Sequence, residues 1–228
     1  MNSANSIDLA TVMSSAVHDM KNSLSIILNN LNTLDGELGL SDHAHQALRQ
    51  LQNEGLRLNN SFVQLLTLYR LENKQYFLNI DCHNVYDCLE EVLLENESSL
   101  NQHKLNANFA CDESLEWFFD RALISGILNT IINNASRYAT NKIELSACMA
   151  ESQLVLSVSD DGPGYPETML LANESSQTAI DFQSGNTGLG LHFARVVSQL
   201  HQNNQQHGHI QTSNEGINGG ARFSIYLP

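Results

Sequence analysis

Basic residues are scarce in this 228-residue sequence, which contains 11 Lys and Arg against 25 Asp and Glu. The resulting net charge of −14 argues against nucleic acids and anionic membrane surfaces as partners. No stretch approaches the roughly 20 apolar residues of a membrane-spanning helix. The N-terminal sequence MNSANSIDLATVMSS also lacks the basic and apolar regions of a signal peptide. These absences predict a cytoplasmic protein with no membrane segment in this chain.

Cysteine is sparse as well, and the four cysteines have no metal-ligand or paired spacing. They are Cys82, Cys88, Cys111 and Cys148. Free thiols in a reducing compartment are therefore favoured over disulfides. With 42% hydrophobic and 16% charged residues, the chain has the composition of an ordinary globular protein and is long enough for one or two domains.

Residues 8–74 carry an apolar heptad pattern that is typical of two long helices. We call these apolar positions the seam; they are Met13, Val17, Met20, Leu24, Ile27, Leu31 and Leu34, then Ala44, Leu48, Leu51, Gly55, Leu58, Phe62, Leu65 and Tyr69. The glycines of DGELGLSD interrupt the pattern, and Gly55 is its one weak position. A single helical hairpin has too little core, so we expect two copies to form a four-helix bundle as a homodimer.

Polar residues gather on the first of these helices, where His18, Asp19 and Asn22 lie close together in the sequence. Val17 and Met20 belong to the seam, so His18 and Asn22 point to a neighbouring face, one helical turn apart. Taken alone, this pattern also fits the solvated face of an amphipathic helix. The remainder of the sequence has to distinguish the two interpretations.

From about residue 78 the pattern changes to a mixture of helices and strands. Helices are predicted over 85–100, 120–139 and about 188–203, and strands over 104–111, 142–149, 153–159, 209–213 and 221–228. This order predicts a mixed sheet covered by helices on one face. The expected fold is therefore α+β, with a helical hairpin domain over residues 1–76 and an α/β-sandwich domain over residues 77–228.

The stretch TIINNASRYA places Asn134, Arg137 and Tyr138 on one helix at spacings of three and four residues. An amide oxygen, a guanidinium and an aromatic ring together are suited to a metal, a phosphate and a flat base. A polar stripe on a sheet-covering helix would give the same pattern, so this segment alone leaves both interpretations open.

Two glycine-rich stretches follow. In SDDGPGYP, Asp160 ends a strand while Gly162 and Gly164 permit close backbone approach. An inward carboxylate there can accept a hydrogen bond from an exocyclic amine such as that of adenine, although a plain turn is the alternative. In GNTGLGLHFARVVSQL, Gly188 and Gly190 run into the N-terminus of a helix, which attracts phosphate. This glycine pattern by itself matches many turns.

In combination and in this order, these segments resemble the sensor histidine kinases of two-component signalling over residues 8–228. HDMKNSL resembles the H box of that family, NNASRYA its N box, DDGPGYP its first glycine box and TGLGL its second. The resemblance implies a dimerisation and histidine-phosphotransfer hairpin. An ATP-binding domain of the type shared by gyrase, Hsp90, histidine kinases and MutL is expected to follow it.

The resemblance assigns roles to matching residues of the hairpin. His18 would be the phosphoacceptor, and Asp19 would be the general base that holds its Nδ1–H while Nε2 attacks the γ-phosphate of ATP. Asn22 occupies the position that is linked in the family to dephosphorylation of the partner response regulator.

The resemblance also assigns roles in the second domain. Asn134 would ligate Mg²⁺, Arg137 would meet phosphate, and Tyr138 would flank the adenine. Asp160 would bind the adenine amine. The backbone of the two glycine boxes would shape the pocket and its lid, through Gly162, Gly164, Thr187, Gly188, Leu189 and Gly190.

Three departures from the family pattern stand out. Ser23 replaces a frequent proline, and Thr130 replaces a commonly found first asparagine of the N box. The segment 167–186 contains no Lys or Arg and no clear F box, with Phe182 as its one aromatic residue. A cation in this segment often helps to hold the triphosphate, so its absence affects the expected rate rather than the nucleotide site.

The sequence thus predicts a homodimeric histidine kinase that uses Mg²⁺ and ATP, phosphorylates His18 and transfers the phosphoryl group to an aspartate of a response regulator. Phosphatase activity towards that regulator is a further expectation. Two alternatives stay open: a histidine phosphotransfer protein whose nucleotide domain has decayed, and a plain ATPase or interaction protein of the wider superfamily. Because the seam begins close to Met1, the chain is either a fragment of a longer sensor or takes its signal from a separate sensor protein. The sequence specifies neither the stimulus nor cis or trans autophosphorylation.

Overall fold

The computed structural model describes residues 20, 22–31, 42–167, 170 and 188–228. The chain divides into two compact units, Met1–Phe77 and Leu78–Pro228. No helix in the described part of the chain is long and apolar enough to cross a membrane. The four cysteines are free thiols, as their spacing indicated.

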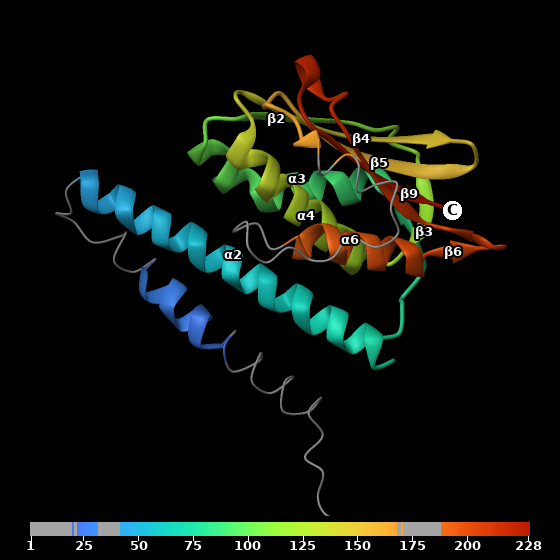
Figure 1. The fold of residues 1–228 in the computed structure, drawn as a ribbon, viewed down its shortest axis with the longest axis horizontal. Helices are drawn as coiled ribbons and strands as arrows, with labels where there is room; N and C mark the ends of the chain where they lie inside the picture. Colours follow the sequence, from blue (N-terminus) through green and yellow to red (C-terminus); the bar gives the residue numbers. More distant parts are fainter. Residues whose placement is uncertain (1–19, 21, 32–41, 168–169, 171–187) are drawn as a thin grey trace, which may run out of the picture. The chain divides into compact units, whose positions relative to one another are not determined.

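The first unit contains a helix over 22–31 and the long helix α2 (Asp42–Glu72), drawn in blue to cyan in Figure 1. Leu24 and Leu48 of the seam are buried, with 9% and 8% of their surface exposed. A Cβ added to Gly55 would lie 2.6 Å from Cδ2 of Leu28, closer than side-chain atoms normally approach. Gly55 is therefore not a weak position of the seam, because its missing side chain allows the two helices to pack closely.

Other residues of the seam remain accessible to solvent. Those with a large exposed surface are Met20 (44%), Ile27 (53%), Leu51 (58%), Leu58 (45%) and Leu65 (39%). Exposure of this many regularly spaced apolar side chains is unfavourable, so the hairpin retains an apolar face that a further element has to cover.

The second unit is built on a five-stranded sheet with the order β2-β4-β5-β9-β8. The strands are β2 (Asn106–Ala110), β4 (Lys142–Ala150), β5 (Gln153–Asp160), β8 (His209–Ser213) and β9 (Arg222–Leu227). β2 pairs with β4 in parallel, whereas every other neighbouring pair in this sheet is antiparallel. β4 and β5 form a hairpin whose turn residues Glu151 and Ser152 both have positive φ, as expected for a two-residue connection.

Three helices cover one face of this sheet: α3 (Val85–Gln102), α4 (Arg121–Tyr138) and α6 (Leu189–Leu200), as Figure 1 shows. The core between the helices and the sheet includes the fully buried side chains of Ile124, Ile127, Leu128, Ile132, Ile143, Leu145, Leu154, Leu156, Phe223 and Ile225. The predicted α+β fold, with a helical region followed by a mixed sheet that helices cover on one face, is confirmed.

Several short elements were not predicted. β1 (Asp81–Asn84) pairs with β3 (Glu116–Phe119), and β6 (Gln202–Asn203) pairs with β7 (Gln206–His207). A 3-10 helix η2 spans Ile217–Gly219. These segments of two to four residues are too short for a periodic pattern to distinguish them from loops.

Helix α6 ends at Leu200, three residues before its predicted end. The next residue, His201, leaves the helix and places its ring against the start of α4. The His201 ring is buried, and its Nε2 accepts a hydrogen bond of 3.0 Å from the backbone N–H of Asp120. Nδ1 must then carry the proton, which it donates to the carbonyl oxygen of Val197 at 2.8 Å. Burial lowers the pKa of His201, so the neutral ring joins the end of α6 to the start of α4.

Candidate functional site

The segments that resemble the N box and the two glycine boxes meet in the second unit. The C-terminal half of α4, the end of β5 and the start of α6 each contribute to this region. Close approaches between glycines of one segment and atoms of another bring these elements together. We call this region the nucleotide site, after the role predicted for it from the sequence.

Asp160 lies at the end of β5 and is 6% exposed. Its Oδ1 accepts hydrogen bonds from the backbone N–H groups of Gly162 at 2.8 Å and Ala221 at 3.4 Å. Burial raises the pKa of Asp160, while these two backbone donors and the neighbouring Asp161 have smaller effects of mixed sign. Because both bonds go to one oxygen, the carboxylate is held in a fixed orientation and its other oxygen can accept a bond from a ligand.

Gly162 allows this first glycine box to pack against the end of α4. A Cβ added at this position would lie 2.5 Å from the carbonyl oxygen of Tyr138 and 2.9 Å from Oδ1 of Asp160. Gly164 has a φ of +80°, and a Cβ there would meet the Asn214 side chain at 2.7 Å. Any larger residue at either position would therefore disturb the geometry around Asp160.

Asn214 fixes the segment that follows Gly164. Its Oδ1 accepts a hydrogen bond from the Tyr165 backbone N–H at 2.7 Å, and its Nδ2 donates to the Tyr165 carbonyl oxygen at 3.1 Å. Burial, with a smaller contribution from the Asp160 charge, raises the pKa of Tyr165 to about 12. The phenol is therefore neutral at physiological pH and lies within the electrostatic reach of Asp160.

Asp161 anchors the same loop to the turn between α4 and β4. Its carboxylate accepts hydrogen bonds from the backbone N–H groups of Thr140, Asn141 and Lys142 at 2.9 to 3.1 Å. Desolvation acts to raise the pKa of Asp161, but these backbone donors outweigh it and lower the pKa. The two adjacent aspartates thus have different roles: Asp161 closes a backbone turn, while Asp160 faces the site.

The second glycine box begins helix α6. Gly188 is the N-cap with a φ of 59°, and a Cβ added to it would have no described atom within 4 Å. Leu189 is the first residue of the helix. A Cβ added to Gly190 would lie 2.8 Å from Cγ2 of Thr130 and 4.0 Å from Nδ2 of Asn134. The helix N-terminus thus lies beside the N box, and its free N–H groups suit a phosphate.

Three N-box residues predicted for the site, Asn134, Arg137 and Tyr138, are all exposed, whereas Ala135 and Ser136 between them are buried. Asn134 has α6 as its neighbour, and the carbonyl oxygen of Tyr138 approaches Gly162. The structure therefore brings the ends of the N box together with both glycine boxes. Thr187, from the same prediction, lies outside the described residues.

The H-box residues belong to the first unit. His18 and Asp19 lie outside the described residues, so their predicted roles rest on the sequence alone. Asn22 is exposed on the helix over 22–31, while Leu24 of the seam is buried. This agrees with the prediction that Asn22 points away from the hairpin core.

Several contributors to the site were missed by sequence reasoning. Tyr165 and Asn214 form the reciprocal pair described above, and the N–H of Ala221 binds Asp160. A Cβ on Gly220 would overlap the carbonyl oxygen of Asp160, so the second glycine of the closing Gly-Gly pair is required by close backbone packing. A Gly-Gly pair before a strand is too common to have indicated this contact.

The residues present fit a magnesium nucleotide. A buried carboxylate can accept the adenine amine, the N-terminus of α6 can bind phosphate, and an amide oxygen of α4 is a hard ligand of the kind that Mg²⁺ prefers. Arg137 and Tyr138, which are predicted for the same site, carry a guanidinium and an aromatic ring, groups suited to a phosphate and a flat base.

Comparison with known proteins agrees with this description. Residues 8–74 match the family model described as His Kinase A (phospho-acceptor) domain, and residues 119–228 match that of the histidine kinase-, DNA gyrase B- and HSP90-like ATPase. The chain is 23% identical over 218 residues to the sensor protein SrrB of Staphylococcus aureus strain N315. This alignment covers 92% of the chain but only 36% of SrrB, so the chain spans about a third of that relative's length.

Solved structures show the same arrangement of elements. The Acinetobacter baumannii histidine kinase AdeS is 25% identical, with a TM-score of 0.56 over 92% of this chain and 96% of that one. Full-length ShkA in complex with AMPPNP has a TM-score of 0.67 at 19% identity, over 96% of this chain and 45% of that one. The latter likeness concerns the fold alone.

Proposed function

Because the chain belongs to the sensor histidine kinases, with their phospho-acceptor domain over residues 8–74 and their ATPase domain over residues 119–228, we propose that it catalyses ATP-dependent phosphorylation of its own His18. The phosphoryl group then passes to an aspartate of a response regulator. The proposed domains are the hairpin, residues 1–76, and the ATP-binding domain, residues 77–228. The two family models fall on either side of this division, which supports it.

The observation that carries this proposal is the convergence of the N box and both glycine boxes around Asp160. A buried carboxylate held on one oxygen by two backbone N–H groups has a second oxygen that can accept a hydrogen bond from the amino group of adenine. The helix N-terminus at Gly188 and Gly190 lies beside Asn134, where the phosphates of the same nucleotide would bind. This geometry of the pocket argues against the alternative of a phosphotransfer protein whose nucleotide domain has decayed.

The proposed reaction needs positioning and charge neutralisation more than covalent assistance. The Nε2 atom of His18 forms a bond to the γ-phosphorus as the bond to the bridging oxygen of ADP breaks, and Asp19 accepts the Nδ1 proton. Arg137 contributes positive charge to the phosphates, and Asn134 would hold Mg²⁺. When bound, Mg²⁺ would neutralise part of the triphosphate charge.

The proposal includes two kinds of partner. The exposed seam residues of the hairpin support a homodimer in which two hairpins form a four-helix bundle. The response regulator would bind the face on which the sequence predicts His18 and Asn22, and Asn22 would also support dephosphorylation of the regulator. Because ATP and response regulators are cytoplasmic, we place both domains in the cytoplasm; a separate or attached sensor would supply the signal.

Incubation of the purified chain with γ-labelled ATP and Mg²⁺ tests the proposed function. We expect label on the protein that acid removes and base does not, as is characteristic of a phosphohistidine. Label that is stable to acid would place the phosphoryl group on a hydroxyl amino acid and contradict the proposal. ATP hydrolysis without labelled protein would favour a plain ATPase instead.

A further inference from the structure

Helix α4 presents two neighbouring faces, each made of every fourth residue. The first face contacts α6. Thr130 and Asn134 approach Gly190, and a Cβ added to Gly126 would lie 4.0 Å from the Phe193 ring. This face contains Asn134, the proposed Mg²⁺ ligand. The rotation of α4 about its axis therefore determines whether Asn134 points to the nucleotide site.

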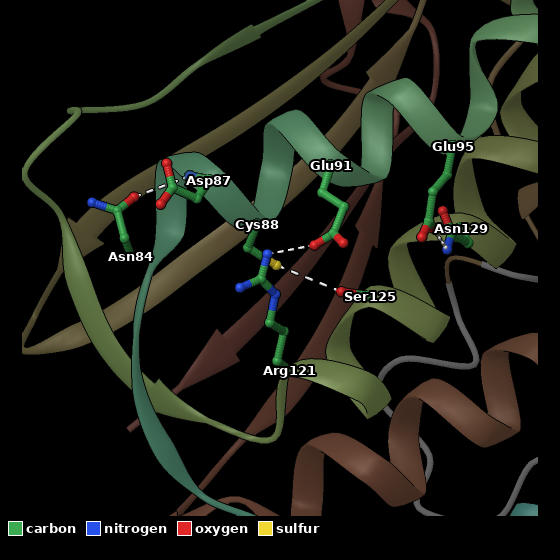
Figure 2. Close-up of polar contacts among 8 residues, drawn as sticks. All are labelled: Asn84, Asp87, Cys88, Glu91, Glu95, Arg121, Ser125 and Asn129. Atoms are coloured by element: carbon green, nitrogen blue, oxygen red, sulfur yellow. Dashed lines mark hydrogen bonds and ion pairs between the residues drawn. The ribbon is translucent and has the colours of Figure 1, made fainter.

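The second face is offset by one residue and contacts α3 through polar side chains, several of which Figure 2 shows. Its members are Arg121, Ser125, Asn129 and Asn133. Arg121 forms an ion pair with Glu91, and Ser125 Oγ lies 3.6 Å from Cys88 Sγ. A contact of this kind at each successive turn of α4 defines its rotation about its own axis more strictly than apolar packing alone.

The end of this face nearest the N box is organised by Asn96 of α3, a buried amide that is 5% exposed. Its Nδ2 donates to the Val92 carbonyl oxygen at 2.7 Å and to Oδ1 of Asn129 at 2.6 Å. Its Oδ1 accepts a hydrogen bond of 3.3 Å from Nδ2 of Asn133. Asn96 thus uses both of its amide hydrogens and its oxygen, and it joins α3 to two successive turns of α4.

The direction of each bond in this network is fixed from its exposed end. The Glu95 carboxylate can only accept, so the Asn129 amide must donate to it, which it does at 2.7 Å (Figure 2). Asn129 then offers its oxygen to Asn96, and the oxygen of Asn96 is left for Asn133. The Asn133 amide also donates to the backbone carbonyl oxygen of Asn129 at 2.8 Å. The network is therefore self-consistent, with one arrangement of donors and acceptors.

A polar network around a buried amide restricts which packing arrangement of the two helices is allowed, whatever its net contribution to stability. Rotation of α4 by one residue would break the bonds to Asn96 and turn Asn134 away from Gly190. We propose that Asn96 is a positioning residue for the nucleotide site, which acts through Asn129 and Asn133 to hold Asn134 towards Mg²⁺. This inference rests on the proposed function, because it assumes that Mg·ATP binds at the N box.

The test is the gain in ATP affinity that Mg²⁺ provides, measured by calorimetry with and without the metal. Asn96→Leu keeps the branching of the side chain at Cγ, with a larger volume, and removes the three hydrogen bonds. Loss of a residue that orients a metal ligand typically lowers metal affinity about 10- to 100-fold. We therefore expect the variant to lose at least about tenfold of the Mg²⁺ gain, while its affinity for metal-free ATP changes less than about twofold. A purely structural role would change both affinities together or change only the midpoint of unfolding.

Two further variants make the result decisive. Ser125→Ala lies on the same face of α4 but at the end far from Asn134, so it should keep the full Mg²⁺ gain. Asn133→Ala removes the bond to Asn96 from a partly buried position, and it should lose part of the gain even if Asn96→Leu does not fold. If Asn133→Ala, or a folded Asn96→Leu, keeps the parent's Mg²⁺ gain, the positioning role is overturned and the proposed function stands. A parent chain that does not bind ATP overturns both.

Discussion

At the scale of single residues, neighbouring side chains of the same type have different roles because their surroundings differ. Asp160 is buried and holds one oxygen towards the site, whereas the Asp161 carboxylate accepts hydrogen bonds from three backbone N–H groups of a turn. The opposite directions of their pKa shifts express this difference. The sequence predicts an inward Asp160 because this residue ends a strand, and its side chain is buried in the structure.

Asp160→Asn should weaken ATP binding about ten- to a hundred-fold. In the variant, an amide NH₂ turned towards the adenine amine would place two hydrogen-bond donors opposite each other, so no bond forms between them. Loss of a hydrogen bond to a charged group costs roughly 1.5–3 kcal/mol. Calorimetric titration with Mg·ATP measures the change. Glu113→Gln, on the loop between β2 and β3, removes one negative charge away from the site and should bind like the parent. Equal affinities for parent and Asp160→Asn would place the nucleotide elsewhere.

Asn22→Ala should keep autophosphorylation and phosphotransfer but lose most dephosphorylation of the regulator. The amide of Asn22 is too weak a base to take a proton, so its proposed role is to orient a water for in-line attack on the phosphorylated aspartate. The decay of a phosphorylated receiver domain, followed with ADP and Mg²⁺ present, compares parent and variant. Equal decay rates would make Asn22 a solvated residue without this role.

Other residues of the site were not predictable, and the reason is physical. Asn214 and Gly220 lie far from Asp160 in the sequence, and their roles arise from backbone contacts across the fold. Neither residue type has a periodicity or spacing that indicates such a contact. A sequence can indicate a carboxylate at a strand end, but the backbone groups that orient it become known only from the tertiary structure.

At the scale of helices and strands, predictability followed the length of the periodic pattern. α3, α4, β4 and β5 each have a long run with one buried face, and the sequence placed them within a few residues of their observed bounds. β1 and β3 were missed because four residues give too little alternation and because their pairing depends on a distant partner. The polar face of α4 was missed because it is offset by only one residue from the face that contacts α6. The sequence pattern of one helix does not show which neighbouring helix each of two such faces contacts.

Stability should fall as the pH decreases below about 6.5, through His201 at the end of α6. Burial lowers the pKa of His201, opposed in part by its bond to the Val197 carbonyl oxygen and by the Asp120 charge. The unfolded chain, with a histidine pKa of about 6.5, therefore takes up a proton before the folded chain does. Protonation then favours unfolding, by at most about 1.4 kcal/mol per pH unit for one group.

Urea unfolding at pH 7.5 and pH 5.5 measures this effect in the parent and in His201→Gln. The variant lacks the titrating ring, so the difference between its two midpoints should be smaller than that of the parent. A parent whose midpoint rises on acidification relative to the variant would contradict the assignment of a neutral, buried imidazole at this junction.

At the scale of the whole molecule, the seam of the hairpin predicts self-association. Leu58 on α2 is 45% exposed and belongs to the seam, whereas Leu56 is 52% exposed and does not. Leu58→Lys should convert a dimer to a monomer because it places a charge in the proposed bundle core, and Leu56→Lys should leave the dimer intact. Sedimentation equilibrium measures the masses. A monomeric parent, or a dimer that tolerates Leu58→Lys as well as Leu56→Lys, would contradict the bundle.

The family and the fold of the chain were predictable from sequence because four motifs occur in a fixed order on a mixed set of helices and strands. The two-unit organisation has its division at Phe77 and Leu78. The motifs do not identify the stimulus that controls the kinase. The chain spans about a third of SrrB, and the segments that match do not specify a stimulus.

If ATP bound at Asp160 phosphorylates His18, transfer of γ-label from ATP to the parent, His18→Gln and Asp160→Asn, measured in parallel, detects it. We predict acid-labile label on the parent, none on His18→Gln although that variant binds ATP within a few-fold of the parent, and strongly reduced label on Asp160→Asn. Label that persists on His18→Gln would contradict the account, because the phosphoryl group would then reside on another residue.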